Sequence, residues 1–469
     1  MSTSLSQSRL RTVWLLSWPA IMEQILSTMV SYVDAAMVGA LGMTASAAVS
    51  VNAAPIWLIG GILSGVGTGY AVQVSHAVGA GQDDRAKAVI RQGVLAAVFC
   101  GVVSFALYRC VAWHLPMWLG AVEPVLGEAR RYLRVYTYCL LFQGSATIFS
   151  GILRCMGNTK TPLVLNTAAN VLNVIFNFFF IYPTRSASIL GLDVTIPGAG
   201  MGVAGAALGT VLAWAFAGVF TAWAALHQGE RFTIHRGESF RPSRAIISQA
   251  VRLGLPSAAE RAMVNIGQVA MTGVVASIDT GVALAANNIA TTAEGLCYLP
   301  AYGIASASTA MVGQSVGAQD RENARNYGVL SAKLGFFICI GTAICLFLFA
   351  HPLASLFNTD PAVVREAAKV LRIVSVAEPF FALSIIYTGA LRGARDVKAP
   401  MFISLICMWG VRIPLAPVLV YWAGLGLSGV WIAMSCDIIL RGILCVWRWR
   451  GDRWERRAFP RIEKRSEEA

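Results

Sequence analysis

Four asparagines recur along one apolar stretch at spacings of four, three and four residues, namely Asn166, Asn170, Asn173 and Asn177. At about 100° of rotation per residue, they form one narrow stripe on a helix. Amide oxygens can ligate a cation, and amide NH2 groups can donate to a carboxylate. We therefore expect the stripe to line a polar cavity. A seam of hydrogen bonds between membrane helices is the alternative.

A lone carboxylate, Asp34, lies deep in the first apolar stretch, with no cationic residue within a helical turn. Ionisable groups inside a membrane are costly and mark functional sites. Glu23 precedes Asp34 by eleven residues, which is about three helical turns, so both face one side. Pro19 removes a backbone hydrogen bond from this segment and favours a bend there. A bent helix with a buried acid suits a gate operated by a proton or a cation.

The coupling site predicted from these patterns is an oxygen-rich pocket that binds H⁺ or Na⁺, with no other cofactor or metal. Its members are Asp34, Asn173, Asn177 and Thr210. Other polar residues of the apolar stretches are expected to line the transport cavity, namely Glu23, Asn166, Asn170, Glu260, Glu294 and Glu378. Arg412 and Asp437 lie on neighbouring stretches and are expected to form an ion pair.

Composition indicates the elements that position these residues. The chain is 56% hydrophobic and 13% charged, with a mean hydropathy of +0.63, whereas soluble domains average about 25% charged residues. A membrane span needs about 20 mostly apolar residues. Twelve stretches qualify, at approximately 13–40, 46–77, 88–112, 131–152, 162–182, 200–226, 246–276, 282–315, 326–350, 367–391, 400–422 and 425–446.

The formal charge of +13 does not indicate nucleic acid as a partner, because lysine and arginine gather in alternate loops. Such an alternation is typical of the positive-inside rule. It predicts a multi-pass protein of the bacterial plasma (inner) membrane with both termini in the cytoplasm. No catalytic motif of the HExxH, GxSxG or phosphate-loop kind occurs, so we do not expect an enzyme.

The chain is a tandem duplication. Gly151–Pro162 matches Gly389–Pro400 at an offset of 238 residues. Each half holds six predicted spans, an even number, so the halves are parallel, as in many secondary transporters. The predicted domains are a first lobe at 1–226, a cytoplasmic linker at 227–245, a second lobe at 246–446 and a basic cytoplasmic tail at 447–469. An extra outer loop at about 183–199 belongs to the first half only.

The duplication also serves as an internal comparison. Asp34 corresponds to Met271, and Asn177 corresponds to Leu415. Duplication alone would have placed the same polar residues in both halves. The predicted coupling site therefore exists only in the first lobe.

At this level of detail the chain resembles the multidrug and toxic compound extrusion (MATE) transporters over about residues 10–446. Each matching motif is weak alone, but their order along twelve spans is specific. The motifs are Trp18-Pro19, Tyr32–Gly39, Val78–Gly81, Leu153–Pro162, Gly202–Ala207 and their copies in the second half.

The resemblance implies an all-α membrane protein with two six-helix lobes around a V-shaped cavity. It implies efflux of cationic or amphipathic compounds in exchange for H⁺ or Na⁺ by alternating access. Asp34, Asn173 and Thr210 match the DinF-like branch, although archaeal relatives have a second aspartate at Asn177. The NorM-like branch has an acid where this chain has Val264. A lipid or lipid-linked precursor flippase of the same superfamily is the alternative. Small substrates and membrane lipids are the expected partners of a monomer.

Overall fold

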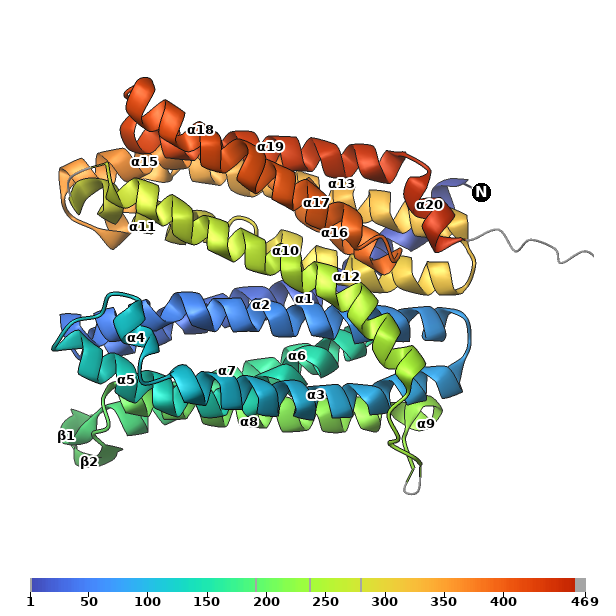
Figure 1. The fold of residues 1–469 in the computed structure, drawn as a ribbon, viewed down its shortest axis with the longest axis horizontal. Helices are drawn as coiled ribbons and strands as arrows, with labels where there is room; N and C mark the ends of the chain where they lie inside the picture. Colours follow the sequence, from blue (N-terminus) through green and yellow to red (C-terminus); the bar gives the residue numbers. More distant parts are fainter. Residues whose placement is uncertain (1, 190–191, 236–237, 279–280, 460–469) are drawn as a thin grey trace, which may run out of the picture.

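The computed structural model describes residues 2–189, 192–235, 238–278 and 281–459. Long helices form two layers that correspond to the two halves of the sequence (Figure 1). Residues 460–469 of the predicted basic tail and Arg236 of the predicted linker lie outside the described residues. The limits predicted for lobes, linker and tail stay predictions.

The first half consists of helices and one hairpin of strands. In chain order these are α1 (Ser2–Gly39), α2 (Met43–Gly79), α3 (Asp83–Val111), α4 (Leu115–Trp118), α5 (Val125–Tyr136), the 3₁₀ turn η1 (Thr137–Cys139), α6 (Leu140–Cys155), α7 (Lys160–Ile181), β1 (Pro183–Ile189), β2 (Leu192–Ala199), α8 (Val203–Leu226) and α9 (Gly229–Phe232).

All regular elements of the second half are helices within its described residues. Its elements are α10 (Arg244–Ala276), α11 (Gly281–Gly295), α12 (Leu299–Gly317), α13 (Arg321–Leu348), α14 (Ala350–Phe357), α15 (Pro361–Ser375), α16 (Glu378–Gly393), α17 (Lys398–Leu405), the π-helical η2 (Ile406–Arg412), α18 (Ile413–Pro417), the π-helical η3 (Val418–Trp422), α19 (Gly426–Arg450) and α20 (Arg453–Ala458).

Every predicted span coincides with helix. Within the described residues, eight helices are long and apolar enough to cross a membrane, and the pair α15–α16, bent by 55°, makes a ninth. The predicted span 131–152 is divided among α5, η1 and α6, and the span 282–315 is divided between α11 and α12. The extra outer loop forms the antiparallel hairpin β1–β2, which is an exception to the all-helical prediction.

Local sequence explains where several helices begin. The Asp320 carboxylate accepts the backbone N–H of Asn323 at 2.9 Å and caps α13. Asp360 caps α15 in the same way, and Pro361 follows it at the first helical position. Short polar side chains satisfy the free N–H groups of a first turn, and proline suits that turn because it has no N–H to leave unpaired.

The lobes contact each other through α2, which packs on α10 and α12, and through α1, which packs on α12. Glycines allow these close crossings. A Cβ on Gly65 would lie 2.6 Å from Ala258 Cα, and one on Gly79 would lie 2.6 Å from the Gln314 carbonyl carbon. All such approaches by glycines of α2 to the second lobe fall within Gly61–Gly79, the half of α2 farthest from Met43.

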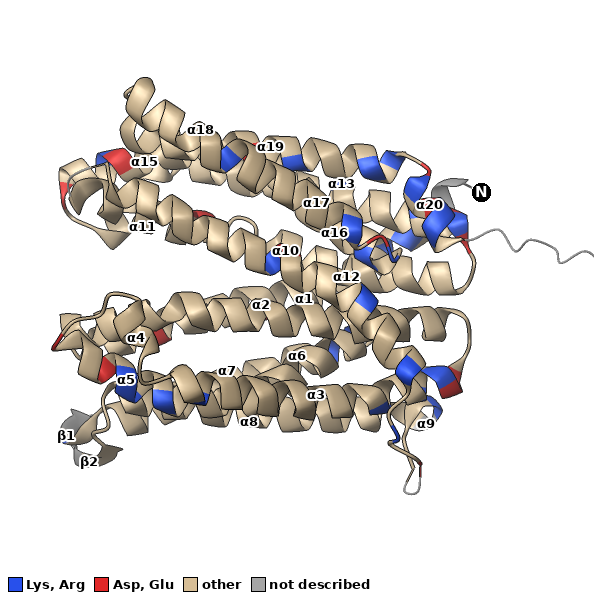
Figure 2. Cartoon of the chain, viewed as in Figure 1, with Lys and Arg blue, Asp and Glu red and all other residues tan. Residues whose placement is uncertain are grey.

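Basic residues gather at this end of the molecule, and the two layers draw apart toward the hairpin end (Figures 1 and 2). We call it the basic end, defined by Arg85, Arg154–Lys160, Arg231, Arg321–Arg325 and Arg392–Lys398. Most lysine and arginine residues lie at the basic end, but some lie elsewhere. Arg130 and Arg131 of α5 lie toward the opposite end, where Arg130 stacks at 4.5 Å on the ring of Trp113.

Candidate functional site

The carboxylate of Asp34 lies against two amides of α7. Asn177 Nδ2 donates to Asp34 Oδ1 at 2.9 Å. One orientation of the Asn173 side-chain amide gives both its NH2 group and its oxygen a hydrogen-bond partner. In this orientation the NH2 group donates to the two Asp34 oxygens at 2.7 and 2.8 Å, and the oxygen accepts from the Thr210 backbone N–H at 3.2 Å. Donors to an ionised carboxylate form short, strong hydrogen bonds. The structure thus brings together the four residues that the sequence predicted as the coupling site.

Close packing of α7 on α8 holds the amides in place. Asn173 is 5% exposed and Asn177 is 1% exposed, whereas Asp34 is half-buried on α1. A Cβ at Gly209 of α8 would collide with Asn177 Oδ1, and one at Gly205 would collide with the backbone of α7. Glycine at these two positions therefore lets the α7 amides reach Asp34. Their roles in ion coupling stay predictions.

The start of the asparagine stripe belongs to a second cluster. Asn166 Nδ2 donates to Glu23 Oε1 at 2.7 Å, and Arg154 of α6 pairs with the same oxygen at 2.6 Å. Glu23 is buried, with 7% of its surface exposed. Asn170 is half-buried on the same stripe and makes no side-chain hydrogen bond to the described residues. The stripe therefore serves two carboxylates of α1, near its middle and near its far end.

The second lobe repeats this ion pair. Arg392 of α16 binds Glu260 of α10 at 2.8 Å, and Ser404 of α17 donates to the same carboxylate at 3.2 Å. These three residues follow Glu23, Arg154 and Asn166 by 237, 238 and 238 residues. Sequence reasoning singled out both glutamates as cavity lining but missed their arginines, although the Leu-Arg motif of each half contains them. Whether either glutamate also faces the substrate stays a prediction.

Met271, the counterpart of Asp34, is packed in the core at 3% exposure. The second lobe instead has two buried glutamates at helix breaks. Glu294 lies at the end of α11, and Glu378 begins α16 after the bend. Neither oxygen of Glu378 has a hydrogen-bond partner among the described residues. The sequence named both residues as cavity lining, and that role stays a prediction.

The expected pair between Arg412 and Asp437 is a minor contact. Arg412 lies 3.9 Å from the Asp437 carboxylate. The main partner is Arg441, one turn along α19, which donates to both oxygens at 2.7 and 2.8 Å. Asp437 is fully buried, so two arginines compensate one desolvated charge. This cluster reads as structural support for the second lobe.

Among the hydrogen bonds that join the lobes at the basic end, two are copies of each other. The ring Nε2 of His76 on α2 donates to the Gly393 carbonyl at 2.7 Å. The Gln314 amide on α12 donates to the Cys155 carbonyl at 2.8 Å. Both partners of the first bond lie 238 residues from the partners of the second, with donor and acceptor lobes exchanged. The basic end therefore has a two-fold pair of hydrogen bonds from side chains of one lobe to backbone carbonyls of the other.

Comparison with known proteins agrees with this duplicated fold. The MatE family model matches residues 19–179 and 256–418, one segment in each half. The probable multidrug resistance protein NorM of Thermotoga maritima is 29% identical over 450 residues, covering 96% of this chain and 94% of that relative. The expected closeness to the DinF-like branch is not confirmed.

Solved structures share the fold. A MOP superfamily transporter from Pyrococcus furiosus, described as having a binding pocket of reverse polarity that suggests a different function, superposes with a TM-score of 0.87 at 21% identity over 96% of both chains. An outward-facing MATE family transporter superposes with a TM-score of 0.85 at 22% identity over 94% of this chain and 95% of that one. The chain belongs to the MatE family, the MATE transporters, and is a multi-pass membrane transporter rather than an enzyme.

Proposed function

We propose that this protein is a secondary active antiporter that exports cationic or amphipathic compounds in exchange for H⁺ or Na⁺. Relatives named as multidrug resistance proteins support the substrate class. The observation that carries the coupling mechanism is the Asp34 cluster. It is a half-buried carboxylate held by amide donors, it lies in one lobe, and it has no cationic partner among the described residues.

The chemistry of the cluster makes it sensitive to an ion. Ionised Asp34 accepts the NH2 groups of Asn173 and Asn177. A proton or a Na⁺ on the carboxylate would remove the charge that these donors stabilise, and the amides would have to turn or separate. Ion binding would therefore change how α1 is held against α7. A ligand shifts a conformational equilibrium only through such a difference in contacts between states.

Helix α1 can transmit that change because it is attached to both lobes. Asp34 binds the first lobe through α7, while the Tyr32 hydroxyl, two residues earlier, donates to the Thr292 carbonyl of α11 in the second lobe at 3.0 Å. Pro19 lies inside α1 nearer the basic end. A displacement of α1 at Asp34 would thus act directly on the contact between lobes, with the turn at Pro19 as the point of bending.

The arrangement of the lobes corresponds to one side of an alternating-access cycle. The close approaches of α2 glycines to the second lobe all lie in the basic-end half of α2. If the basic end is cytoplasmic, as the positive-inside rule predicts, this is an outward-facing state, and both termini lie in the cytoplasm of a plasma membrane. Substrate would then leave between the lobes at the hairpin end. We expect a monomer to suffice, with lipids as the only other partners.

The test is ethidium efflux from proteoliposomes under an imposed pH gradient and then a Na⁺ gradient. We expect the Asp34→Asn variant to lose efflux driven by whichever gradient drives the wild type, because an amide cannot change charge. Val171→Ala is the control on the same helix, because Val171 is 53% exposed and lies outside the asparagine stripe, and it should keep efflux. Efflux equal in Asp34→Asn and wild type would refute coupling in the first lobe and direct attention to Glu378. No efflux under either gradient would favour the flippase alternative.

A further inference from the structure

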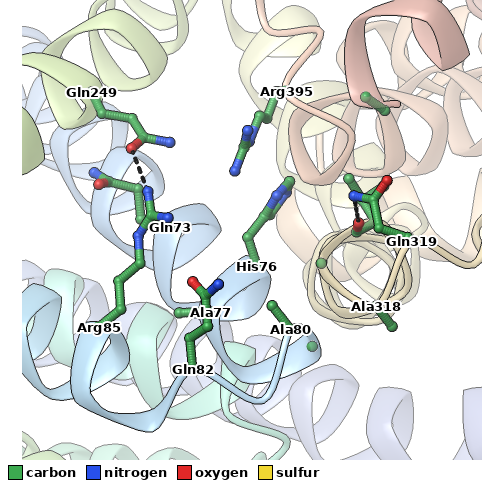
Figure 3. Close-up of a pocket in the computed structure, with 14 residues that line it drawn as sticks. Gln73, His76, Ala77, Ala80, Gln82, Arg85, Gln249, Ala318, Gln319 and Arg395 are labelled. Carbon is green, nitrogen blue, oxygen red and sulfur yellow. Dashed lines mark hydrogen bonds between the residues drawn. The ribbon is translucent and has the colours of Figure 1, made fainter. Parts of the chain in front are cut away.

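A polar cavity of about 520 Å³ lies between the lobes at the basic end. Its wall comes from the ends of α2 and α12, the starts of α3 and α10, and the turn after α16. Figure 3 shows Arg85 and Arg395 reaching toward its centre from different sides, with His76 below Arg395. Its volume falls within the range of ligand pockets, about 300–1,000 Å³. The cavity is separate from the Asp34 cluster, which lies toward the other end of α1.

The positive charges of this cavity are not compensated. The Arg395 side chain makes no hydrogen bond or ion pair with any described residue, and Arg85 makes one long bond, to Gln249 at 3.4 Å. The residues that line the cavity in the described structure include no aspartate or glutamate. The acids two residues before Arg85 and one residue after Arg395 have other partners: Asp83 binds Arg231 at 2.7 Å, and Asp396 binds Arg448 and Arg457.

The two arginines influence each other. Although the Arg395 side chain as a whole is exposed, its surroundings partly desolvate the guanidinium. This desolvation, and secondly the charge of Arg85, lower the pKa of Arg395. Two like charges thus face one cavity between the lobes. An anion in that space would remove their repulsion.

Backbone geometry gives an independent indication that side chains at this cavity have a function. Among the described residues, only two non-glycine residues have a positive φ, Gln319 at 59° and Arg395 at 62°, and both line the cavity. Their counterparts 238 residues earlier are Gly81 at 67° and Gly157 at 89°. Left-handed backbone disfavours every residue with a Cβ, and glycine avoids this cost. The same turns therefore form with glycine in the first lobe, whereas the second lobe tolerates strain to present side chains here.

We propose that this cavity binds an anion through its phosphate group, held by the guanidinium groups of Arg85 and Arg395. The planar guanidinium fork matches phosphate oxygens in two-bond contacts. The amides of Gln249 and Gln319 supply further polar contacts in the same cavity. Arg85 belongs to the first lobe and Arg395 to the second, so the bound anion links the lobes and stabilises the closed basic end.

The phosphate group can come from a soluble anion or from the headgroup of an anionic lipid. The cavity opens at the basic end, where both sources are available to a membrane protein with a cytoplasmic basic end. The inference does not depend on which ion drives transport. It requires only that the two lobes close over this cavity, as they do here.

The test measures thermal unfolding of the full-length protein in a neutral detergent while pyrophosphate is titrated at constant ionic strength. The key variant is Arg395→Gly, which removes the guanidinium and also relieves the backbone strain, so it should unfold at or above the wild-type temperature without anion. Arg85→Ala removes the other charge. Arg244→Ala is the matched control, because Arg244 is exposed at the same end but outside the cavity.

We expect pyrophosphate to raise the unfolding temperature of the wild type and Arg244→Ala in a saturable way. In Arg395→Gly and Arg85→Ala the half-maximal concentration should rise by at least about tenfold, the effect of losing one strong charge-assisted contact. General stabilisation by salt would act on all variants alike and would not saturate. A parallel series in nanodiscs of phosphatidylglycerol or phosphatidylcholine distinguishes the sources: a response confined to phosphatidylglycerol assigns the site to a lipid headgroup. No response to either source, or a full response in Arg395→Gly, would overturn the proposal.

Discussion

Replacing Gly79 by alanine should open the basic end. A Cβ at this position of α2 would lie 2.6 Å from the Gln314 carbonyl carbon and 2.8 Å from its Cα, and nearer still to the carbonyl oxygen. Those atoms are backbone, so no rotamer change can avoid the clash, and α2 must move away from α12. By the internal repeat, Gly317→Ala meets the His76 backbone at 2.9 Å in the same way. Both substitutions therefore penalise the closed state and leave an open state unaffected.

The size of the effect follows from the cost of overpacking. Forcing extra atoms into a well-packed contact costs about 1–3 kcal/mol. Because every 1.4 kcal/mol changes an equilibrium constant tenfold, the ratio of open to closed protein should rise by about 5- to 150-fold. The hydrogen bond from Gln314 to Cys155 breaks in the same movement, so the upper part of this range is expected.

Cys155 provides the assay. Its side chain is 3% exposed and packs with Ala71 and Ala310 between the lobes. It should react with a maleimide only when the basic end opens. The labelling rate of its peptide, followed by mass spectrometry, should rise in Gly79→Ala by the factor given above. Gly205→Ala is the control, because its clash with the α7 backbone lies within the first lobe. Wild-type labelling of Cys155 in a folded Gly79→Ala protein would refute the reasoning.

Two further predictions concern the carboxylates of the first lobe and their copies. Glu23→Gln and Glu260→Gln should each lower the free energy of unfolding in detergent by about 2–3 kcal/mol, because each leaves a mostly buried arginine without its counter-charge. This value is at the low end for a buried ion pair because the arginines are partly exposed. An unchanged free energy of unfolding in both variants would show that these ion pairs make no net contribution to stability. Asn177→Ala removes the 2.9 Å donor to Asp34 and should shift the pH or Na⁺ concentration that gives half-maximal efflux, while an unshifted midpoint would mean that the amide does not contact the working carboxylate.

Much of the helical framework is predictable from the sequence, because apolar stretches long enough to span a membrane leave few alternatives to helix. The breaks within spans are not predictable in this way. The bend between α15 and α16 falls where hydropathy is uninterrupted, and only the pair Glu378-Pro379 marks the position. Helices also extend past the apolar limits, as α3 does by beginning at Asp83. A helix can therefore continue into polar residues at the membrane surface, beyond the apolar residues that mark the span.

The candidate coupling site was predictable to a different degree at each residue. The asparagine stripe shows that α7 has one polar face, but spacing along one helix cannot say which carboxylate that face meets. The structure answers by assigning Asn177 to Asp34 and Asn166 to Glu23. Contacts between lobes were beyond sequence reasoning, since they depend on how two repeats close on each other. Even so, the replacement of Gly157 by Arg395 within a matched motif was a visible signal.

The duplication separates two kinds of function within one fold. Both halves keep the glycines at the close helix crossings and the side chains that donate to backbone carbonyls at the basic end. These residues form a symmetric contact that closes the basic end, because the simplest interface between two copies of one repeat uses the same contact twice. Residues that only one half has, Asp34 in the first lobe and Arg395 in the second, belong to the proposed coupling and anion sites, which have no symmetric counterpart. If this division is correct, Gly79→Ala and Gly317→Ala should raise Cys155 labelling to a similar extent. Substitutions at Asp34 or Arg395 should instead leave the intrinsic opening unchanged and alter only its response to the coupling ion or to the phosphate-bearing anion.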